Sequence, residues 1–255
     1  HMTKAFILEA LREVESNPHA KLIVYEPKRE FYAWLSSLGL KSPVHYFMPS
    51  DLRSVALDFA RDYPNDLDSM TLSLAFHPKR LNENQEFWGD ALRTIYAGVM
   101  TAIKRRIGRF DLRLTCLVLE NEDYTEQVLG TDPYLVQAKK LVKDHGDAVG
   151  ETKQNIQMTI HSRIAEMKII AAQLEQARER AKINHEQPFS LYDYLKTPAS
   201  GVLSISKDAT YGLVQDPMNG VLIHRLVQLL DAGQYDKKRK VFIVIDEFPT
   251  LAGDQ

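Results

Sequence analysis

Residues 241–245 near the C-terminal end of the sequence form an apolar run, Val-Phe-Ile-Val-Ile, which Asp246 and Glu247 follow directly. A short run rich in β-branched residues predicts a strand buried on both faces, as strands of a parallel sheet are. The two carboxylates are therefore expected at the carboxyl end of this strand. There an acid can hold the Mg²⁺ of a bound nucleotide, and a following Glu can orient the attacking water. An ordinary core strand that happens to end in Asp-Glu fits the run as well.

The N-terminal part of the chain alternates helix and strand. Apolar periodicity predicts helices over residues 3–15 and 28–38, and short apolar runs predict strands over residues 21–26 and 44–48. The loops between them are short. Such alternation is typical of a parallel sheet.

Residues 52–188 show helical patterns without a convincing strand. The predicted helices cover residues 52–62, 84–107, 112–120, 124–129, 133–143 and 147–180. In the last of these, apolar residues from Ile156 to Leu174 recur every three or four positions, which predicts a core stripe. A seam for a coiled-coil partner is the alternative.

Sheet patterns return in the last part of the chain, with strands predicted over residues 201–206 and 241–246 and a helix over 219–232. The expected fold class is α/β, a parallel sheet with an all-α subdomain inserted between two of its strands. We divide the chain into residues 3–51 and 189–255, the two parts of the α/β domain, and residues 52–188, the all-α insertion. A terminal strand needs neighbours, so we expect this chain to be a piece of a longer protein.

Composition limits the classes of function. The formal net charge of −2 argues against nonspecific nucleic-acid binding by the whole surface, so any DNA contact has to be local. Cys116 is the only cysteine and lies in an apolar helical context, which predicts a core residue and neither a disulfide nor a cysteine metal site. His1 and Met2 are typical of an expression vector and are left out of the fold argument.

Six segments, taken in chain order, are similar to motifs of one family. They are residues 22–31, 47–54, 86–93, 129–131, 189–195 and 245–251. Together they resemble the type IV secretion coupling proteins of the TraD/TrwB kind, whose fold is a RecA-like P-loop NTPase sheet, present here in part. The sequence departs from the family at Glu26, where Asp is usual, at Arg29, where Gly is frequent, and at Tyr194, where the family has Trp.

The resemblance implies roles for three residues. Residues 245–251 resemble the Walker B strand, so Asp246 is expected to hold Mg²⁺ through water and Glu247 to act as the general base. Residues 3–11 resemble the helix after the P-loop, which makes Thr3 the expected Mg²⁺-binding hydroxyl, although an ordinary helix cap explains it as well. The sequence contains no G-x-x-x-x-G-K-[ST] loop. We therefore expect the loop upstream, and weak ATP and Mg²⁺ binding without turnover in this chain.

The resemblance also implies the setting of the longer protein. It would be an ATP-driven DNA translocase, a homo-hexamer at the cytoplasmic face of the bacterial inner membrane. It would pass single-stranded DNA, with its relaxase and relaxosome proteins, to the components of a type IV secretion channel. The present chain alone is expected to be soluble and monomeric.

Basic residues offer a local DNA contact. Lys104, Arg105, Arg106 and Arg109 could meet phosphates, and a solvated helix end is the alternative explanation. Two other functions stay open at this point. The helical block could be a non-catalytic interaction module for relaxosome or secretion partners, or the chain could belong to another ring-forming secretion or DNA-pumping ATPase.

Overall fold

The computed structural model describes residues 2–28, 30–76, 83–130, 132, 135–143, 150–208, 210–233 and 239–246. The chain forms two compact units, one made of His1–Asp58 with Gln176–Gln255 and the other of Phe59–Glu175. The second unit is thus inserted between the two segments of the first. The borders predicted from the sequence lie at 51/52 and 188/189, and the contacts divide the chain at 58/59 and 175/176.

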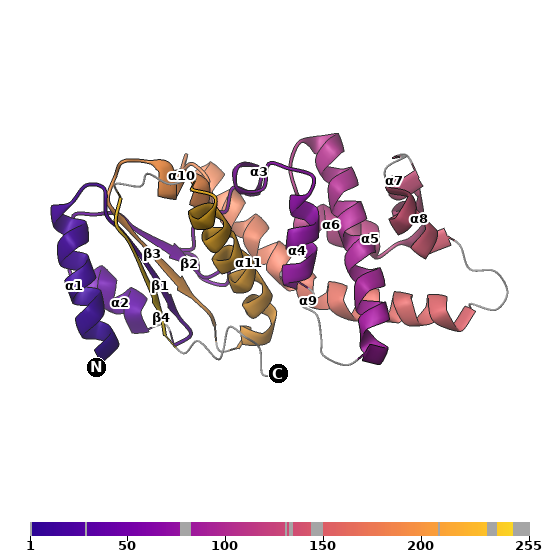
Figure 1. Ribbon diagram of the computed structural model, residues 1–255, viewed down its shortest axis with the longest axis horizontal. Coiled ribbons are helices and arrows are strands. Elements are labelled where there is room, and N and C mark those ends of the chain that lie inside the picture. Colours follow the sequence, from indigo (N-terminus) through magenta and orange to yellow (C-terminus); the bar gives the residue numbers. More distant parts are fainter. Residues whose placement is uncertain are drawn as a thin grey trace. The chain divides into compact units, whose positions relative to one another are not determined.

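The first unit is an α/β layer structure (Figure 1). In chain order it contains α1 (Met2–Ser16), β1 (Lys21–Glu26), α2 (Glu30–Ser37), β2 (Val44–Phe47), α10 (Leu191–Lys196), β3 (Gly201–Ser206), α11 (Gly212–Asp231) and β4 (Val241–Ile245). The strands form one sheet in the order β2-β3-β1-β4, and all three pairings are parallel. The predicted parallel sheet is confirmed.

Alternation along the strands distributes side chains to the two faces of this sheet. Leu22, Val24, Val202 and Val244 belong to one buried cluster with the apolar residues of α1 and α2. Those two helices therefore cover one face, and α11 lies on the other (Figure 1). All residues of β1 and β3 are buried, as expected for central strands of a parallel sheet.

The helix before β4 begins earlier than predicted. The helix was predicted to start at Asn219, two residues after Pro217. In the structure α11 begins at Gly212 and contains Pro217. Met218, Val221 and Leu222 are buried against the sheet, and this apolar stripe outweighs the one main-chain hydrogen bond that a proline removes.

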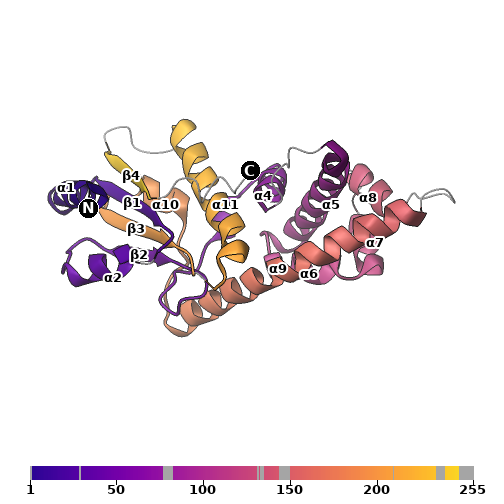
Figure 2. The ribbon, with the colours of Figure 1, turned by 90° about the horizontal axis from the view of Figure 1, so that it is seen from below.

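The second unit is all helical (Figure 2). It contains α3 (Phe59–Asp62), α4 (Asp68–Phe76), α5 (Glu83–Ile107), α6 (Leu112–Leu119), α7 (Glu122–Gly130), α8 (Val136–Lys143) and most of α9 (Gly150–Ile183). Five helices were predicted over residues 84–180 and are confirmed as α5 to α9. The helix predicted over residues 52–62 is wrong for its first part, where Leu57 instead forms an isolated β-bridge with Phe189.

Helix α4 was missed because part of its inward face is polar. Ser69 and Ser73 are buried there. The Ser73 hydroxyl donates to the carbonyl oxygen of Arg93 at 2.8 Å, and Thr101 donates to the Ser69 hydroxyl at 2.7 Å. Buried serine hydroxyls that have hydrogen-bond partners therefore occupy positions where an amphipathic helix usually carries apolar residues.

The apolar stripe of α9 is core. Ile160, Ile164, Met167 and Ile170 are all buried, which favours the core stripe over a seam for a coiled-coil partner. Cys116 is buried as predicted, and burial raises the pKa of its thiol to about 12. Among the described residues, no helix combines the length and the apolar character that crossing a bilayer requires.

Candidate functional site

The carboxyl ends of the four parallel strands meet at one edge of the sheet, and an acid stands at or shortly after each end. Glu26 ends β1, Asp51 and Asp208 follow β2 and β3, and Asp246 follows β4. Ligands of open α/β sheets bind outside the carboxyl ends of the strands. We therefore take this edge as the candidate functional site.

Asp246 lies half-buried directly after β4. Its main-chain N–H donates to the carbonyl oxygen of Tyr25 at 3.0 Å, so it continues the β1–β4 ladder and stands beside Glu26. The structure thus places this predicted residue at the carboxyl edge. Glu247, the predicted general base, lies outside the described residues.

Glu26 has a structural task at this edge. It is 1% exposed, and its carboxylate accepts the main-chain N–H groups of Glu30 at 3.0 Å and Phe31 at 2.9 Å, at the start of α2. The hydroxyl of Ser206 approaches the same carboxylate at 3.5 Å. Burial raises the pKa of Glu26, and hydrogen bonds from main-chain N–H groups at the start of α2 oppose that rise. Both carboxylate oxygens of Glu26 cap the start of α2. Asp246 is therefore better suited than Glu26 to bind a metal ion.

The first turn of α1 lies at the same edge. Only a short loop joins α1 to β1, so the helix runs antiparallel to the strand and its N-terminus reaches the carboxyl edge (Figure 1). Thr3 is half-buried in this turn. The next residue, Lys4, lies 4.0 Å from the carboxylate of Glu30 on α2, whose start is capped by Glu26. The sheet therefore brings the predicted residues Thr3 and Asp246 to one edge.

Polar side chains after β3 were missed by the sequence analysis. Lys207 pairs with Asp216 at 3.0 Å, and the Gln215 side chain accepts the N–H of Asp208 at 2.7 Å. Asn219 is fully buried one turn later on α11. These contacts tie the start of α11 to the carboxyl end of β3. The sequence did contain a signal for these contacts. Lys207 and Asp208 directly follow a predicted strand, and the amide residues Gln215 and Asn219 stand four positions apart in the segment that follows.

The segment 189–195 lies at the opposite, amino edge. The Tyr194 hydroxyl donates to the carbonyl oxygens of Gly201 at 2.9 Å and Leu22 at 3.2 Å, so it holds α10 across two strands. The ammonium group of Lys21 lies 4.4 Å from the centre of the Tyr194 ring. This motif therefore has a structural role here, and the hydroxyl makes Tyr194 a fitting replacement for the Trp of the family pattern.

The predicted DNA-contacting residues lie in the helical unit, at the end of α5. The ammonium of Lys104 donates to the carbonyl oxygen of Pro64 at 2.6 Å and to Asp66 at 3.1 Å. Arg105 pairs with Asp66 at 2.8 Å and also with Asp132. These ion pairs hold the loop before α4 and offset much of the local positive charge.

The remaining two basic residues are more exposed. Arg109 lies 3.8 Å from Asp111, and the side chain of Arg106 is exposed to solvent. A phosphate backbone approaching this helix end would therefore meet charges that already have partners on the protein. Contact with DNA therefore requires a rearrangement of these ion pairs.

The donor set at the carboxyl edge suits Mg²⁺ held mainly by a nucleotide. Within the described ranges no group of three or more His, Cys, Asp or Glu side chains could hold a metal ion by itself. One carboxylate and one hydroxyl at a helix N-terminus are hard oxygen ligands, and Mg²⁺ in nucleotide sites takes few protein ligands. The N-terminus of α1 also favours a negative phosphate by its dipole.

Comparison with known proteins decides the family. Residues 6–253 match the model of the type IV secretion-system coupling protein DNA-binding domain. The chain belongs to this family. No curated protein matches the sequence of this coupling protein family member.

Solved structures of the bacterial conjugative coupling protein TrwB share the fold. The trigonal form of TrwBdeltaN70 with sulphate is 16% identical, with a TM-score of 0.67, and the match covers 91% of this chain and 50% of that one. TrwB with ADP and Mg²⁺ is 15% identical, with a TM-score of 0.62 and coverages of 94% and 58%. TrwB with the ATP analogue ADPNP is 16% identical, with a TM-score of 0.61 and coverages of 94% and 59%.

The chain thus spans about half the length of the solved proteins it matches. The likeness establishes the fold class expected from the sequence, part of a RecA-like P-loop NTPase sheet with an all-α insertion. The family match also removes the alternative of a ring ATPase from another family.

Proposed function

We propose that this chain is the core of a conjugative coupling protein, an ATP-driven DNA translocase that links the relaxosome to a type IV secretion channel. The observation that supports the proposal is that Asp246 and the first turn of α1 both lie at the carboxyl edge of a parallel sheet, in a member of the coupling protein family. Solved TrwB structures with ADP and Mg²⁺ and with an ATP analogue support a nucleotide as the ligand.

Each residue has a stated task in this proposal. Asp246 holds Mg²⁺ through a water molecule, the Thr3 hydroxyl is a further Mg²⁺ ligand, and Glu247 takes a proton from the attacking water. The metal supplies charge stabilisation at the transferring phosphoryl group. A Gly-rich loop and its Lys, neither of which occurs in these 255 residues, are needed to cradle the phosphates. This chain alone is therefore proposed to bind nucleotide weakly and not to hydrolyse it.

The longer protein is proposed to work as a homo-hexamer at the cytoplasmic face of the bacterial inner membrane. Single-stranded DNA passes through it with the relaxase, toward the secretion channel. These partners and this location rest on the family alone. The residues that precede Thr3 in the longer polypeptide are the direct test. A G-x-x-x-x-G-K sequence there supports the ATPase, and its absence would favour an interaction module without catalysis.

A docking role for the helical unit also has an observation in its favour. Leu67, Met70 and Leu74 are 83%, 45% and 41% exposed and lie at helical spacing on and just before α4. Ser69 and Ser73 of this helix face inward together with Leu72, so its apolar residues are divided between the inward and the exposed face. A partner protein that covers this face is compatible with the ATPase proposal.

DNA binding by this chain is expected to be weak and sensitive to salt. Replacing Lys104, Arg105 and Arg106 by Ala is expected to lower the affinity and to flatten the dependence of log K on log salt by about one unit per lost phosphate contact. Fluorescence anisotropy with a single-stranded oligonucleotide over a salt series measures both. Asp66→Asn is the matched control: it keeps the cations and removes their carboxylate partner, so affinity should rise. Unchanged binding in both variants would show that the end of α5 does not contact DNA.

A further inference from the structure

Residues 48–54 form a tightly bonded turn after the carboxyl end of β2. The N–H of Asp51 donates to the carbonyl oxygen of Met48 at 2.8 Å, and the N–H of Ser54 donates to the carbonyl oxygen of Asp51 at 3.1 Å. The Ser54 hydroxyl accepts the N–H of Met48 at 3.2 Å. This turn contains most of the family-like segment 47–54, for which the proposed nucleotide site gives no role.

The turn fixes Arg53, although the side chain of this residue is 61% exposed. Its Nε and Nη2 atoms donate to the two carboxylate oxygens of Asp51 at 2.9 and 2.7 Å, and its main-chain N–H donates to the same carboxylate at 2.8 Å. Asp51 is itself anchored, since Arg180 donates to its carbonyl oxygen at 3.2 Å. Among the described residues, no acceptor faces the Nη1 atom of Arg53. A guanidinium that is held in place and keeps free N–H groups at the surface is suited to bind a ligand.

The ring of Tyr32, on α2, lies next to this guanidinium. It stacks on the ring of Tyr46, on β2, with centroids 3.6 Å apart and 15° between the planes. The guanidinium carbon of Arg53 is 4.7 Å from the Tyr32 centroid and 5.8 Å from the Tyr46 centroid. If Arg53 were stacked on the outer face of Tyr32, its distance to Tyr46 would approach the sum of the other two distances. Arg53 therefore lies beside the stacked pair and leaves the outer face of Tyr32 uncovered.

The stacked pair offers one ring to the solvent. Tyr46 is 2% exposed, and its hydroxyl donates to the sulfur of Met48 at 3.2 Å, so the lower ring is fixed in the core. Tyr32 is half-buried, and in the described part of the chain no second ring stacks on it. Its exposed part therefore lies on the side away from Tyr46. A flat aromatic ligand can stack there, with Arg53 at its edge.

The charges favour a nucleobase over a simple anion as this ligand. Asp51 offsets most of the charge of Arg53, so a free phosphate is attracted only weakly. Stacking of a base on an aromatic ring needs no net charge. The strand order is β2-β3-β1-β4, so β2 and β4 are three strand spacings apart, or about 14 Å. The surface at Tyr32 is therefore separate from the Mg²⁺ site proposed at Asp246.

We propose that Tyr32 and Arg53 bind one nucleotide of single-stranded DNA. Tyr32 stacks on the base, and Arg53 donates from its free N–H groups to the edge of that base or to the adjoining phosphate. This inference rests on the proposed function, in which single-stranded DNA passes through the longer protein. It differs from the contact predicted at the end of α5, because a base and not the phosphate charge supplies most of the affinity.

Fluorescence anisotropy of a labelled thymidine oligonucleotide with the 255-residue protein tests the stacking. Tyr32→Leu is expected to weaken binding by about fivefold to a hundredfold, the range expected for one base on one aromatic ring. Tyr32→Phe keeps the ring and should bind like the wild type. An abasic oligonucleotide of the same length keeps every phosphate. The wild type should bind it more weakly, and Tyr32→Leu should bind it as the wild type does.

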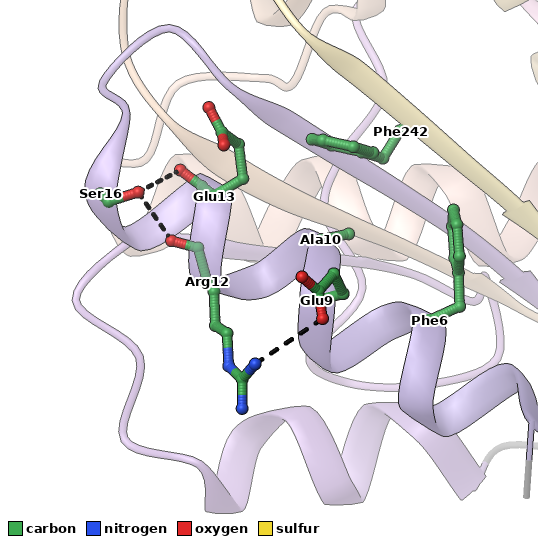
Figure 3. A pocket seen from close by; sticks show the side chains of 7 residues that line it. All are labelled: Phe6, Glu9, Ala10, Arg12, Glu13, Ser16 and Phe242. Carbon is green, nitrogen blue, oxygen red and sulfur yellow. Dashed lines mark hydrogen bonds and ion pairs between the residues drawn. The ribbon is translucent and has the colours of Figure 1, made fainter.

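Arg12 provides a matched control for Arg53. It is an exposed arginine of the same unit, 3.6 Å from Glu9, and it lines a pocket between α1 and β4 (Figure 3). Arg53→Lys keeps the charge and loses the planar fork, so its affinity for the thymidine oligonucleotide should fall by about fivefold. Arg12→Lys makes the same change away from Tyr32 and should bind like the wild type. Both variants should keep the salt dependence of the wild type, because no charge is lost.

The outcomes separate this inference from the proposed function. Unchanged binding of the thymidine oligonucleotide by Tyr32→Leu, or an equal loss on the oligonucleotides with and without bases, would overturn the inference alone. A wild type that binds no oligonucleotide would overturn it as well, while ATP hydrolysis by a longer chain still tests the proposed function. In that longer chain, Tyr32→Leu should leave the affinity for Mg-ATP unchanged. A loss of that affinity with unchanged DNA binding would assign the Tyr32 ring to the base of ATP and contradict the proposal.

Discussion

In a longer chain that contains the phosphate-binding loop, Glu247→Gln is expected to lower ATP hydrolysis by about a hundredfold or more and to spare Mg-ATP binding. The amide cannot take a proton from water, and general bases contribute on the order of a hundred to ten thousandfold in rate. The metal and phosphate contacts do not involve this residue in our account, so the loss should fall on kcat. A steady-state ATPase assay measures it, with nucleotide binding measured in parallel.

Glu26→Gln is the matched control for this experiment. Glu26 is a buried carboxylate beside Asp246, but its oxygens cap α2, so the variant should lower stability and leave hydrolysis within a few-fold of the parent. If Glu247→Gln hydrolyses ATP at close to the parental rate, Glu247 is a structural residue only. If Glu26→Gln abolishes hydrolysis in a folded protein, the assignment of the base is wrong.

Replacing Lys21 by Met is expected to stabilise this chain at neutral pH by up to about 3 kcal/mol, at about 1.4 kcal/mol for each unit of pKa shift. Lys21 is 2% exposed at the amino edge of the sheet. Burial, with the nearby charge of Arg239, lowers the pKa of Lys21 from 10.5 to about 8. Its ammonium rests on the Tyr194 ring, and within the described part of the chain no ion pair joins it to a carboxylate. A methionine fills the same space without a charge.

The sign of the pH dependence follows from the lowered pKa. Below pH 8 the folded and unfolded states both carry the proton, and the cost of burying the charge is fully present. Between pH 8 and 10.5 the unfolded state holds more protons, so the wild type gains stability as pH rises. The advantage of Lys21→Met should therefore shrink over that range. Denaturant unfolding at several pH values measures it.

The exposed Lys196 provides the control for this second prediction. Lys196→Met removes a charge next to Tyr192 at the surface, and its effect on stability should be small at every pH. A Lys21→Met variant that is less stable than the wild type at pH 7 would show that the contact with Tyr194 outweighs the burial cost. The account of the amino edge would then be wrong.

The sequence predicted those parts of the fold that local pattern determines. The fully buried strands β1 and β3 are short segments that are mainly apolar, and the buried stripe of α9 keeps a regular spacing. Prediction from the sequence failed where polar contacts replaced the apolar pattern. Helix α4 turns Ser69 and Ser73 inward, and their partners lie on another helix, beyond the reach of local periodicity.

The residues of the candidate site could be predicted where local sequence pattern determines their position, and could not where contacts between distant segments do. Asp246 follows an apolar run, so its place at the carboxyl edge could be predicted. The capping role of Glu26 could not, because it depends on how α2 returns to the sheet. The partners of Lys104 and Arg105 were also hidden, since Asp66 is far away in the sequence and only the fold brings it to them.

Isothermal titration with Mg-ADP tests most directly whether this edge is one part of a nucleotide site. The account predicts binding weaker than about millimolar for the 255-residue chain, and binding near micromolar for a longer chain that includes the residues before Thr3. Asp246→Asn in the longer chain should abolish the dependence of that affinity on Mg²⁺. Micromolar binding by the 255-residue chain, or an Asp246→Asn variant that binds Mg-ADP as the parent does, would contradict it.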